Sequence, residues 1–194
     1  MGYVFQNPDD QLFQSSLRKE VMFGPRNLGF GEDRVAGQTQ HALEMVGLSA
    51  AADKHPYDLS PGERKLAALA AVLAMDTPVV ILDEPTTGQD YSGVDLIGKI
   101  VEDLKDSGKT IITITHDIDF CAEHFQHVAV LARGELLLEG PTREILAQEE
   151  ILNQTFVDPP QLIRLAQRLH LNSMPLTVAE FINIFLGRED DGSN

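Results

Sequence analysis

Two adjacent carboxylates, Asp83 and Glu84, directly follow a short apolar run at residues 79–82 and directly precede Pro85. A β-branched run of this length predicts a parallel strand that is buried on both faces, and the proline prevents its extension. Open α/β sheets bind their ligands at the carboxyl ends of their strands. The two carboxylates are therefore candidates for a ligand site, although acidic residues are also an ordinary way for a strand to leave a core.

Two further polar side chains follow strand-like runs. Gln6 comes after residues 3–5, and His116 comes after residues 110–115. Both fall where the carboxyl end of a strand is expected. A histidine is often only a surface or capping residue, so the position directly beyond a strand is what makes His116 a candidate.

A helix is predicted to begin at Ser60. Serine is a favoured N-cap residue, Pro61 suits the first helical position, and Glu63 completes a capping box of the form S-x-x-E. The apolar stripe of this helix consists of Leu66, Leu69, Ala70, Leu73 and Ala74. Helix capping by itself explains Ser60 and Glu63, and a role in ligand binding is compatible with it.

Helical periodicity predicts the elements that surround these positions. The chain between residues 11 and 74 is mainly helical, with one helix stopped by Gly24 and Pro25 and another ended by Gly47 in a left-handed conformation. Apolar residues at helical spacing over residues 97–104 predict another helix, which ends near Gly108.

The last third of the chain combines a hairpin with short helices. Residues 128–131 and 136–138 flank Arg133 and Gly134, which is typical of a β-hairpin. Residues 162–169 form an amphipathic helical pattern, and Thr177 with Glu180 predicts a second capping box at the start of a short helix.

Composition limits the classes of function. The chain has 194 residues, 43% of them hydrophobic, which suits a folded core. Its formal charge of −15 argues against nucleic acid as a partner, because binding to phosphate backbones needs clustered lysine and arginine. The single cysteine, Cys121, excludes an internal disulfide framework. No apolar run approaches the roughly 20 residues that span a bilayer.

The ordered set of Gln6, residues 59–63, Asp83 with Glu84, and His116 resembles the ATPase subunit of ATP-binding cassette (ABC) transporters. The resemblance covers essentially the whole chain. Residues 3–31 are similar to the energy-coupling-factor group, whose members import vitamins, cobalt and nickel. The end of the chain resembles the small helical extension of those subunits.

The resemblance implies an α/β fold. It is the fold of an incomplete P-loop NTPase of the ABC type, with a mainly parallel sheet, a helical insert and a small C-terminal helical extension. The expected division is a partial ABC ATPase domain at residues 1–148, with the insert at about residues 11–75, and the extension at residues 149–194.

The resemblance also implies roles at the strand ends. Asp83 would hold Mg²⁺ through water, and Glu84 would orient and deprotonate the water that attacks ATP. Gln6 would touch the metal or that water. His116 would contact the γ-phosphate, where charge develops during the reaction.

A second set of roles concerns ATP on another subunit. Ser60 and Gly62 would meet the γ-phosphate of that ATP, using the helix N-terminus as an anion site, and Glu63 belongs to the same turn. Asp90 falls in the loop that would cross the interface of a homo- or heterodimer. Residues 11–31 would grip an integral membrane coupling subunit, which would hold the protein on the cytoplasmic face of the membrane.

The chain departs from the family pattern in two places. No G-x-x-x-x-G-K-[ST] phosphate loop occurs in the 194 residues, so we expect an N-terminal part of the domain to be missing and this chain alone not to bind ATP tightly. The loss would leave an apolar slot between residues 110–115 and the strand at 128–131. In residues 59–63, which correspond to the signature motif of the family, Pro61 and Glu63 replace the usual glycine and glutamine. Pro61 removes one backbone donor and Glu63 adds negative charge, so we expect weaker contact with phosphate.

Two functions follow from these features. The first is the ATP-hydrolysing subunit of an energy-coupling-factor-type importer. The alternative is a degenerate, non-catalytic partner that supplies Ser60 and Gly62 to a complete cassette and couples to the membrane subunit. A soluble cassette ATPase of DNA repair or translation would share Asp83 and Glu84, but the acidic balance argues against it.

Overall fold

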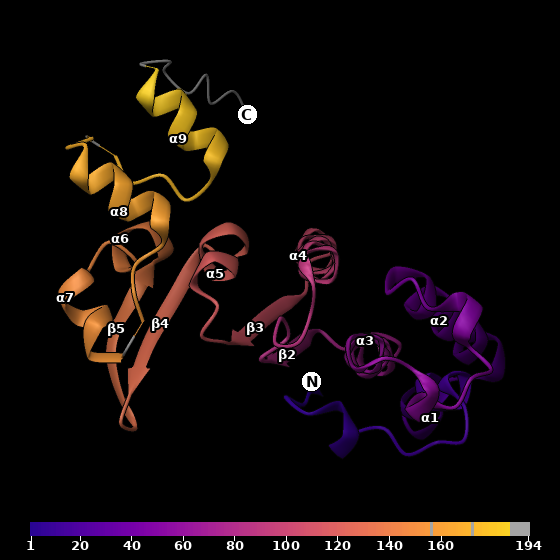
Figure 1. Ribbon diagram of the computed structural model, residues 1–194. Coiled ribbons are helices and arrows are strands. Elements are labelled where there is room, and N and C mark those ends of the chain that lie inside the picture. The colour runs from indigo at the N-terminus through magenta and orange to yellow at the C-terminus, as the bar shows by residue number, and fades with distance from the viewer. Residues whose placement is uncertain (156, 172, 187–194) are drawn as a thin grey trace. The chain divides into compact units, whose positions relative to one another are not determined.

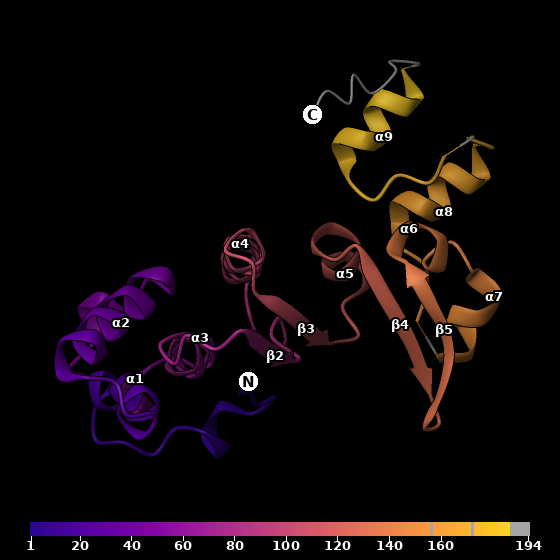
Figure 2. The same cartoon turned by 180° about the vertical axis from the view of Figure 1, so that it is seen from behind.

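The chain divides into two units, Met1–Thr115 and His116–Asn194, which are described in turn. The structure is a computed structural model and describes residues 1–155, 157–171 and 173–186 (Figures 1 and 2). Residues 187–194, which include the end of the predicted extension, lie outside the described residues. The predicted domain boundary between residues 148 and 149 stays a prediction.

The first unit is built on a three-stranded parallel sheet of order β1-β2-β3. The strands are β1 (Gly2–Val4), β2 (Val79–Asp83) and β3 (Thr110–Ile114). The register pairs Val4 with Leu82 and Asp83 with Ile114. The carboxyl ends of all three strands therefore meet at one edge of the sheet.

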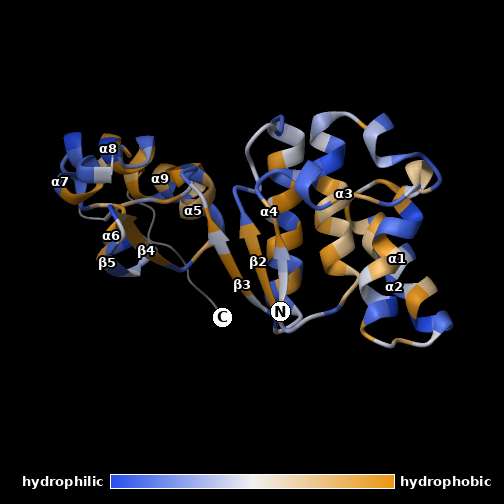
Figure 3. Cartoon of the chain, turned by 90° about the horizontal axis from the view of Figure 1, so that it is seen from below, coloured by the Kyte–Doolittle hydropathy of each residue, from blue (hydrophilic) through white to orange (hydrophobic). Residues whose placement is uncertain are grey.

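The prediction that β2 is buried on both faces is wrong. Val80 and Leu82 are buried, whereas Ile81 on the opposite face is only half-buried. Helix α3 (Pro61–Leu73) packs on the buried face of the sheet. The approach is close at Gly2, because a Cβ added to this glycine would lie 2.5 Å from Val72 Cγ1. Helix α4 (Tyr91–Asp106) contacts β3. Mostly apolar residues occupy β2 and β3, and α4 combines apolar with charged residues (Figure 3).

At one side of this sheet, β3 presents apolar side chains to solvent. Ile112 is 47% exposed and Ile114 is 50% exposed. Within the three-stranded sheet β3 pairs with β2 only. The predicted slot beside this strand stays a prediction.

Three helices form the helical part of the first unit, as the periodicity predicts. They are α1 (Leu17–Asn27), α2 (Glu32–Met45) and α3, and each contacts the other two. A short 3₁₀ turn at Pro8–Asp10 precedes α1, and two more, at Ser49–Ala51 and Pro56–Asp58, lie between α2 and α3. After α2 the chain turns at Gly47, whose φ of +70° confirms the predicted left-handed end.

The predicted stop at Gly24 and Pro25 is wrong, because α1 continues to Asn27. Gly24 is needed for close packing, since a Cβ at this position would lie 2.5 Å from Met75 Cγ. Pro25 is buried inside the helix, and the helix ends only before Gly29, at φ +78°. A proline in the last turn removes one N–H without ending the helix, because the packing of its neighbours holds the turn.

The second unit contains the predicted hairpin and a set of short helices. Strands β4 (His127–Ala132) and β5 (Glu135–Pro141) are antiparallel and turn at Arg133 and Gly134, both with positive φ. This confirms the hairpin. The helices are α5 (Ile118–His124), α6 (Thr142–Ile145), α7 (Glu149–Leu152), α8 (Gln161–Arg168) and α9 (Val178–Phe185), with a 3₁₀ turn at Asn153–Thr155.

The second predicted capping box is only half formed. Thr177 Oγ1 accepts a hydrogen bond from the Glu180 amide, as expected for an N-cap. The Glu180 carboxylate accepts instead from the amide of Leu176, at 2.8 Å, and pairs with both terminal nitrogens of Arg143, at 3.0 Å each. A bidentate arginine is a stronger partner for a carboxylate than one backbone amide.

A buried carboxylate fixes the chain that leads into α1. Glu20 is only 3% exposed, and its Oε2 accepts hydrogen bonds from the amides of Phe13, at 2.9 Å, and Gln14, at 2.7 Å. One side chain therefore satisfies two backbone donors of a segment that has no regular secondary structure.

We predict that Glu20→Ala lowers the free energy of unfolding by about 1–3 kcal/mol, because two amides lose their acceptor in a buried place. Glu20→Gln, which keeps a carbonyl oxygen, should lose less. Urea denaturation followed by circular dichroism measures the difference. Equal transition midpoints for Glu20→Ala and the wild type would show that the contact does not stabilise the unit.

Candidate functional site

Asp83 ends β2 and lies next to a tyrosine of β1. The hydroxyl of Tyr3 donates a hydrogen bond to Asp83 Oδ2 at 2.8 Å. This bond and the negative charge of Asp83, with some burial, raise the pKa of the Tyr3 phenol. Tyr3 therefore stays protonated and orients one carboxylate oxygen, while the carboxylate itself remains half-buried at the edge of the sheet.

Glu84 follows with an uncommon backbone conformation, φ +46°. Its amide donates to the carbonyl of Ile114 at 2.8 Å, which continues the pairing of β2 with β3 by one bond. Its Oε2 accepts from the hydroxyls of Thr115, at 3.2 Å, and Thr87, at 3.3 Å. Left-handed conformations of residues other than glycine cluster at functional sites, where surrounding contacts hold them in place.

Gln6 lies two residues beyond β1 and is exposed. Because β1 and β2 are parallel neighbours, Gln6 is at the same edge of the sheet as Asp83. The segment around it is held by Gln11, whose Oε1 accepts from the Phe5 amide and whose Nε2 donates to the Ala68 carbonyl of α3. Strand order thus brings Gln6, Asp83 and Glu84 to one edge, as the sequence predicts.

Lys65 is not identified from the sequence as a residue that contacts this site. It is 6% exposed, and its Nζ donates to the main-chain carbonyls of Glu84 and Thr87. Burial lowers the pKa of this lysine, and the charges of Glu84 and Asp83 oppose that shift. A signal was available: Lys65 lies one turn before Leu69, so it falls on the buried side of the helix.

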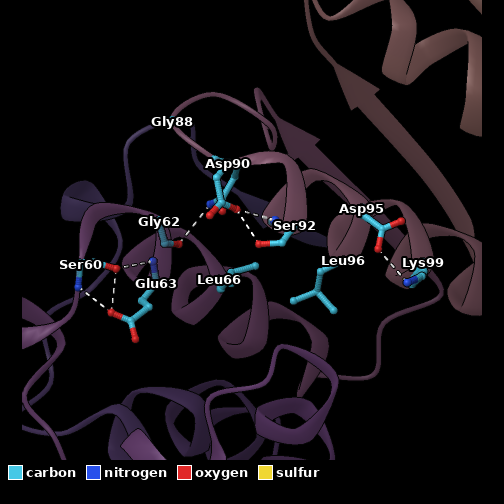
Figure 4. Close-up of a pocket in the computed structure, with 12 residues that line it drawn as sticks. Ser60, Gly62, Glu63, Leu66, Gly88, Asp90, Ser92, Asp95, Leu96 and Lys99 are labelled. Carbon is cyan, nitrogen blue, oxygen red and sulfur yellow. Dashed lines mark hydrogen bonds and ion pairs between the residues drawn. The ribbon is translucent and has the colours of Figure 1, made fainter.

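Ser60 and Glu63 form the predicted capping box at the start of α3. The Glu63 amide donates to Ser60 Oγ, and Glu63 Oε2 accepts from the amide and the hydroxyl of Ser60, at 2.8 and 2.7 Å (Figure 4). These hydrogen bonds lower the pKa of Glu63, so its carboxylate is charged at neutral pH.

Residues of two segments line a pocket of about 630 Å³ beside this turn (Figure 4). The N-cap and first turn of α3 provide Ser60, Gly62 and Glu63, and the second segment, which consists of the loop before α4 and the first turns of α4, provides Gln89 and Asp90. Gln89 Nε2 donates to the Gly62 carbonyl at 3.1 Å, which ties the two sides together. Four of the predicted site residues therefore share one pocket.

Asp90 has a structural task in this pocket as N-cap of α4. Its Oδ1 accepts from the amide of Gly93 and the hydroxyl of Ser92, both at 2.8 Å. These bonds lower the pKa of Asp90. The pocket wall thus carries the negative charges of Glu63 and Asp90, together with an ion pair between Asp95 and Lys99 at 2.7 Å.

His116 belongs to the second unit, and its predicted part in a common site stays a prediction. It lines a pocket of about 430 Å³ together with Asp119, Pro159 and Arg164. Burial, followed by the charge of Asp117, raises the pKa of Asp119. Sequence reasoning did not single out Asp119.

Two apolar side chains are exposed next to the segment that Glu20 fixes. Phe13 is 61% exposed and Phe23 is 42% exposed, and their rings meet edge to face with centroids 4.8 Å apart. Leu12 in the same segment is buried, at 2% exposure, so of these three side chains only the two rings are presented on the surface. Within the described ranges, no helix combines the length and the apolar content that crossing a bilayer requires.

The described residues contain no cluster of three or more His, Cys, Asp and Glu side chains arranged to hold a metal ion. The Asp83 carboxylate and the side-chain amide of Gln6 are side chains at the sheet edge that could supply oxygen ligands. This set fits Mg²⁺, which takes few protein ligands and keeps several waters.

Comparison with known proteins places the chain in a family. The model of the family described as ABC transporter matches residues 1–87. The energy-coupling factor transporter ATP-binding protein EcfA of Methanosphaera stadtmanae is 37% identical over 193 residues, which are 96% of this chain and 69% of the relative. The chain spans only 30% of a 40% identical relative from Methanosarcina acetivorans.

Solved structures agree with the sequence comparison. The structure of cbiO1 from Clostridium perfringens, described as part of the ABC transporter complex cbiONQ, matches with a TM-score of 0.68 and 38% identity, over 88% of this chain and 67% of that one. The dimeric ABC transporter cassette MJ0796 matches with a TM-score of 0.66 and 25% identity, over 74% and 63% of the two chains. The α/β fold class is confirmed, and this chain belongs to the family of ABC transporter ATP-binding proteins.

Proposed function

We propose that this chain is part of the ATP-hydrolysing subunit of an energy-coupling-factor-type importer for a vitamin or for cobalt or nickel. One observation carries the proposal: the same unit contains both the sheet edge with Asp83 and Glu84 and a pocket at the start of α3. We call this pocket, which is lined by Ser60, Gly62, Glu63 and Asp90, the signature pocket. ATP is the substrate, and the similarity to EcfA and to cbiO1 supports the choice of importer.

At the sheet edge, Asp83 and Gln6 would hold Mg²⁺, mainly through water. The metal would neutralise charge on the phosphates of ATP. The Tyr3 hydroxyl donates to Asp83 Oδ2, which would orient the carboxylate for this role. Gln6, which is exposed, would adjust to the metal or to the attacking water.

Glu84 would accept the proton of the water that attacks the γ-phosphate. Thr87 and Thr115 both donate to Oε2, which orients the carboxylate. A general base must be held within hydrogen-bond reach of its water, so this support is a catalytic requirement. His116 would contact the same γ-phosphate.

In the signature pocket, Ser60 and the Gly62 amide would meet the γ-phosphate of ATP bound to a second cassette. The start of α3 favours an anion, but Pro61 lacks an N–H and the charged Glu63 repels phosphate. The Ser60 hydroxyl also has to leave Glu63 to donate to the ligand. We therefore propose a weaker contact than glycine and glutamine would give.

A non-catalytic role in a heterodimer is the second candidate. It is supported by one observation: residues of this chain alone form the signature pocket. In this role the chain would donate Ser60 and Gly62 to a complete partner. In both roles Phe13 and Phe23 would contact an integral membrane coupling subunit at the cytoplasmic face.

We predict that Glu84→Gln, in a protein that joins this chain to a phosphate loop, lowers the ATPase rate at least about 100-fold, because the water loses its base. ATP binding should persist, since the amide keeps the shape of the side chain. Phosphate release and nucleotide binding measure the two effects. An unchanged rate would contradict hydrolysis at this site.

We predict that Ser60→Ala in this chain lowers the ATPase rate of a complete partner cassette by about tenfold, because one donor to the γ-phosphate is lost. The N-cap is lost as well, so Ser60→Asp serves as a control that caps the helix but repels phosphate. The role in trans fails if the partner's rate is the same with wild-type chain and with both variants.

Phe13→Ser should weaken binding to the membrane coupling subunit by about tenfold, because truncating a central aromatic contact costs roughly 1–3 kcal/mol. Leu131→Ser is the matched control, since Leu131 is 66% exposed and lies in the second unit. Co-purification and titration measure the effect. Equal losses for both variants would argue against a specific contact at Phe13.

A further inference from the structure

A buried lysine joins the two halves of the proposed site. Lys65 lies on α3, one turn beyond Ser60 and Gly62, and its Nζ reaches across to the loop that follows β2. There it donates to the carbonyl oxygens of Glu84 and Thr87, at 3.2 Å for Thr87. Because both acceptors are backbone oxygens, the lysine fixes the conformation of the main chain at these residues.

The main chain at Glu84 needs such a contact. With φ at +46°, Glu84 is in a region that residues with a Cβ seldom occupy, and a turn that the Thr87 amide closes on its carbonyl begins there. The Ile114 carbonyl holds the amide of Glu84, and Lys65 holds its carbonyl oxygen. The direction in which the Glu84 carboxylate leaves the backbone therefore depends on a bond from each side.

A second side chain fastens the same loop to the same helix. Gln89 Nε2 donates to the Gly62 carbonyl at 3.1 Å, only two residues from Ser60. The loop is thus attached to α3 at both ends, by Lys65 near Glu84 and by Gln89 near Asp90. A displacement of the first turn of α3 has to move this loop with it, because both attachments are hydrogen bonds to backbone carbonyls.

We propose that Lys65 is a positioning residue that couples the signature pocket to the catalytic carboxylate. A γ-phosphate that engages Ser60 and Gly62 would shift the first turn of α3, and Lys65 would carry that shift to the main chain of Glu84. Water activation at one nucleotide would then depend on occupancy of the pocket that faces the other. The inference rests on the proposed function for its catalytic consequence, but the coupling itself is a property of this chain.

Lys109 provides a matched control within the same unit. Its Nζ donates to a carboxylate, Asp76 Oδ1 at 2.6 Å, and to a backbone carbonyl, that of Thr77 at 3.2 Å. Its side chain is 19% exposed. Replacing Lys109 removes a comparable amine from a comparable place but does not touch the loop after β2.

Hydrogen exchange on this chain tests the coupling directly. The Thr87 amide donates to the Glu84 carbonyl and the Gln89 amide to the Thr86 carbonyl, so both report on the loop. We expect Lys65→Met to accelerate exchange of these two amides by about tenfold, while amides in the middle of α2 keep their rates. Lys109→Met should leave both loop amides unchanged.

Two outcomes of the exchange measurement overturn the proposal. One is an unchanged loop in Lys65→Met. The other is uniform acceleration throughout Met1–Thr115, because Lys65 would then support the whole unit and not the loop. The test does not require ATP, so it decides the role of Lys65 even if the proposed function fails.

The assembled transporter supplies the catalytic readout. Lys65→Met should lower kcat for ATP by about tenfold and change KM by less than about twofold, because the lysine does not contact nucleotide. Lys109→Met should change neither constant. A normal kcat in Lys65→Met contradicts positioning, whereas absence of ATPase in the wild-type assembly contradicts the proposed function and leaves the exchange result standing.

Discussion

Parallel pairing of β2 with its two neighbours is the constraint on which the site depends. Parallel strands end at the same edge, so the register that pairs Val4 with Leu82 and Asp83 with Ile114 places Gln6, Asp83 and Thr115 together. The amide of Glu84 extends this pairing beyond the strand. A slip of β2 by one residue would turn Asp83 to the face on which Val80 and Leu82 are buried.

The site contains a buried positive charge, Lys65, although the chain as a whole is acidic. In a protein with a net charge of −15, the buried Lys65 is directed to backbone carbonyls beside two carboxylates. Its desolvation, which lowers the pKa of the lysine, is partly offset by the charges of Glu84 and Asp83. The lysine thus places a positive charge beside the two carboxylates of this edge.

Local signals in the sequence were sufficient for the elements that present the site. The capping box of Ser60 and Glu63, the strand before Asp83 and the left-handed end at Gly47 depend on neighbours within four residues, so the local sequence predicts them.

The predictions that were wrong concern features that depend on distant contacts. Pro25 remains helical because α1 packs against its surroundings, β2 is covered on one face only, and Glu180 takes Arg143 as its partner. The tie from Lys65 to Glu84 joins residues 19 positions apart, and no local pattern states it.

The central claim is that the start of α3 recognises ATP held by another cassette, and nucleotide-dependent association measures this most directly. Sedimentation of this chain with a complete energy-coupling-factor cassette, whose catalytic glutamate is replaced by glutamine, gives the affinity with and without ATP. We expect association at least about tenfold tighter with ATP, because Ser60 and Gly62 gain a phosphate to contact. The same affinity with and without ATP would contradict the account.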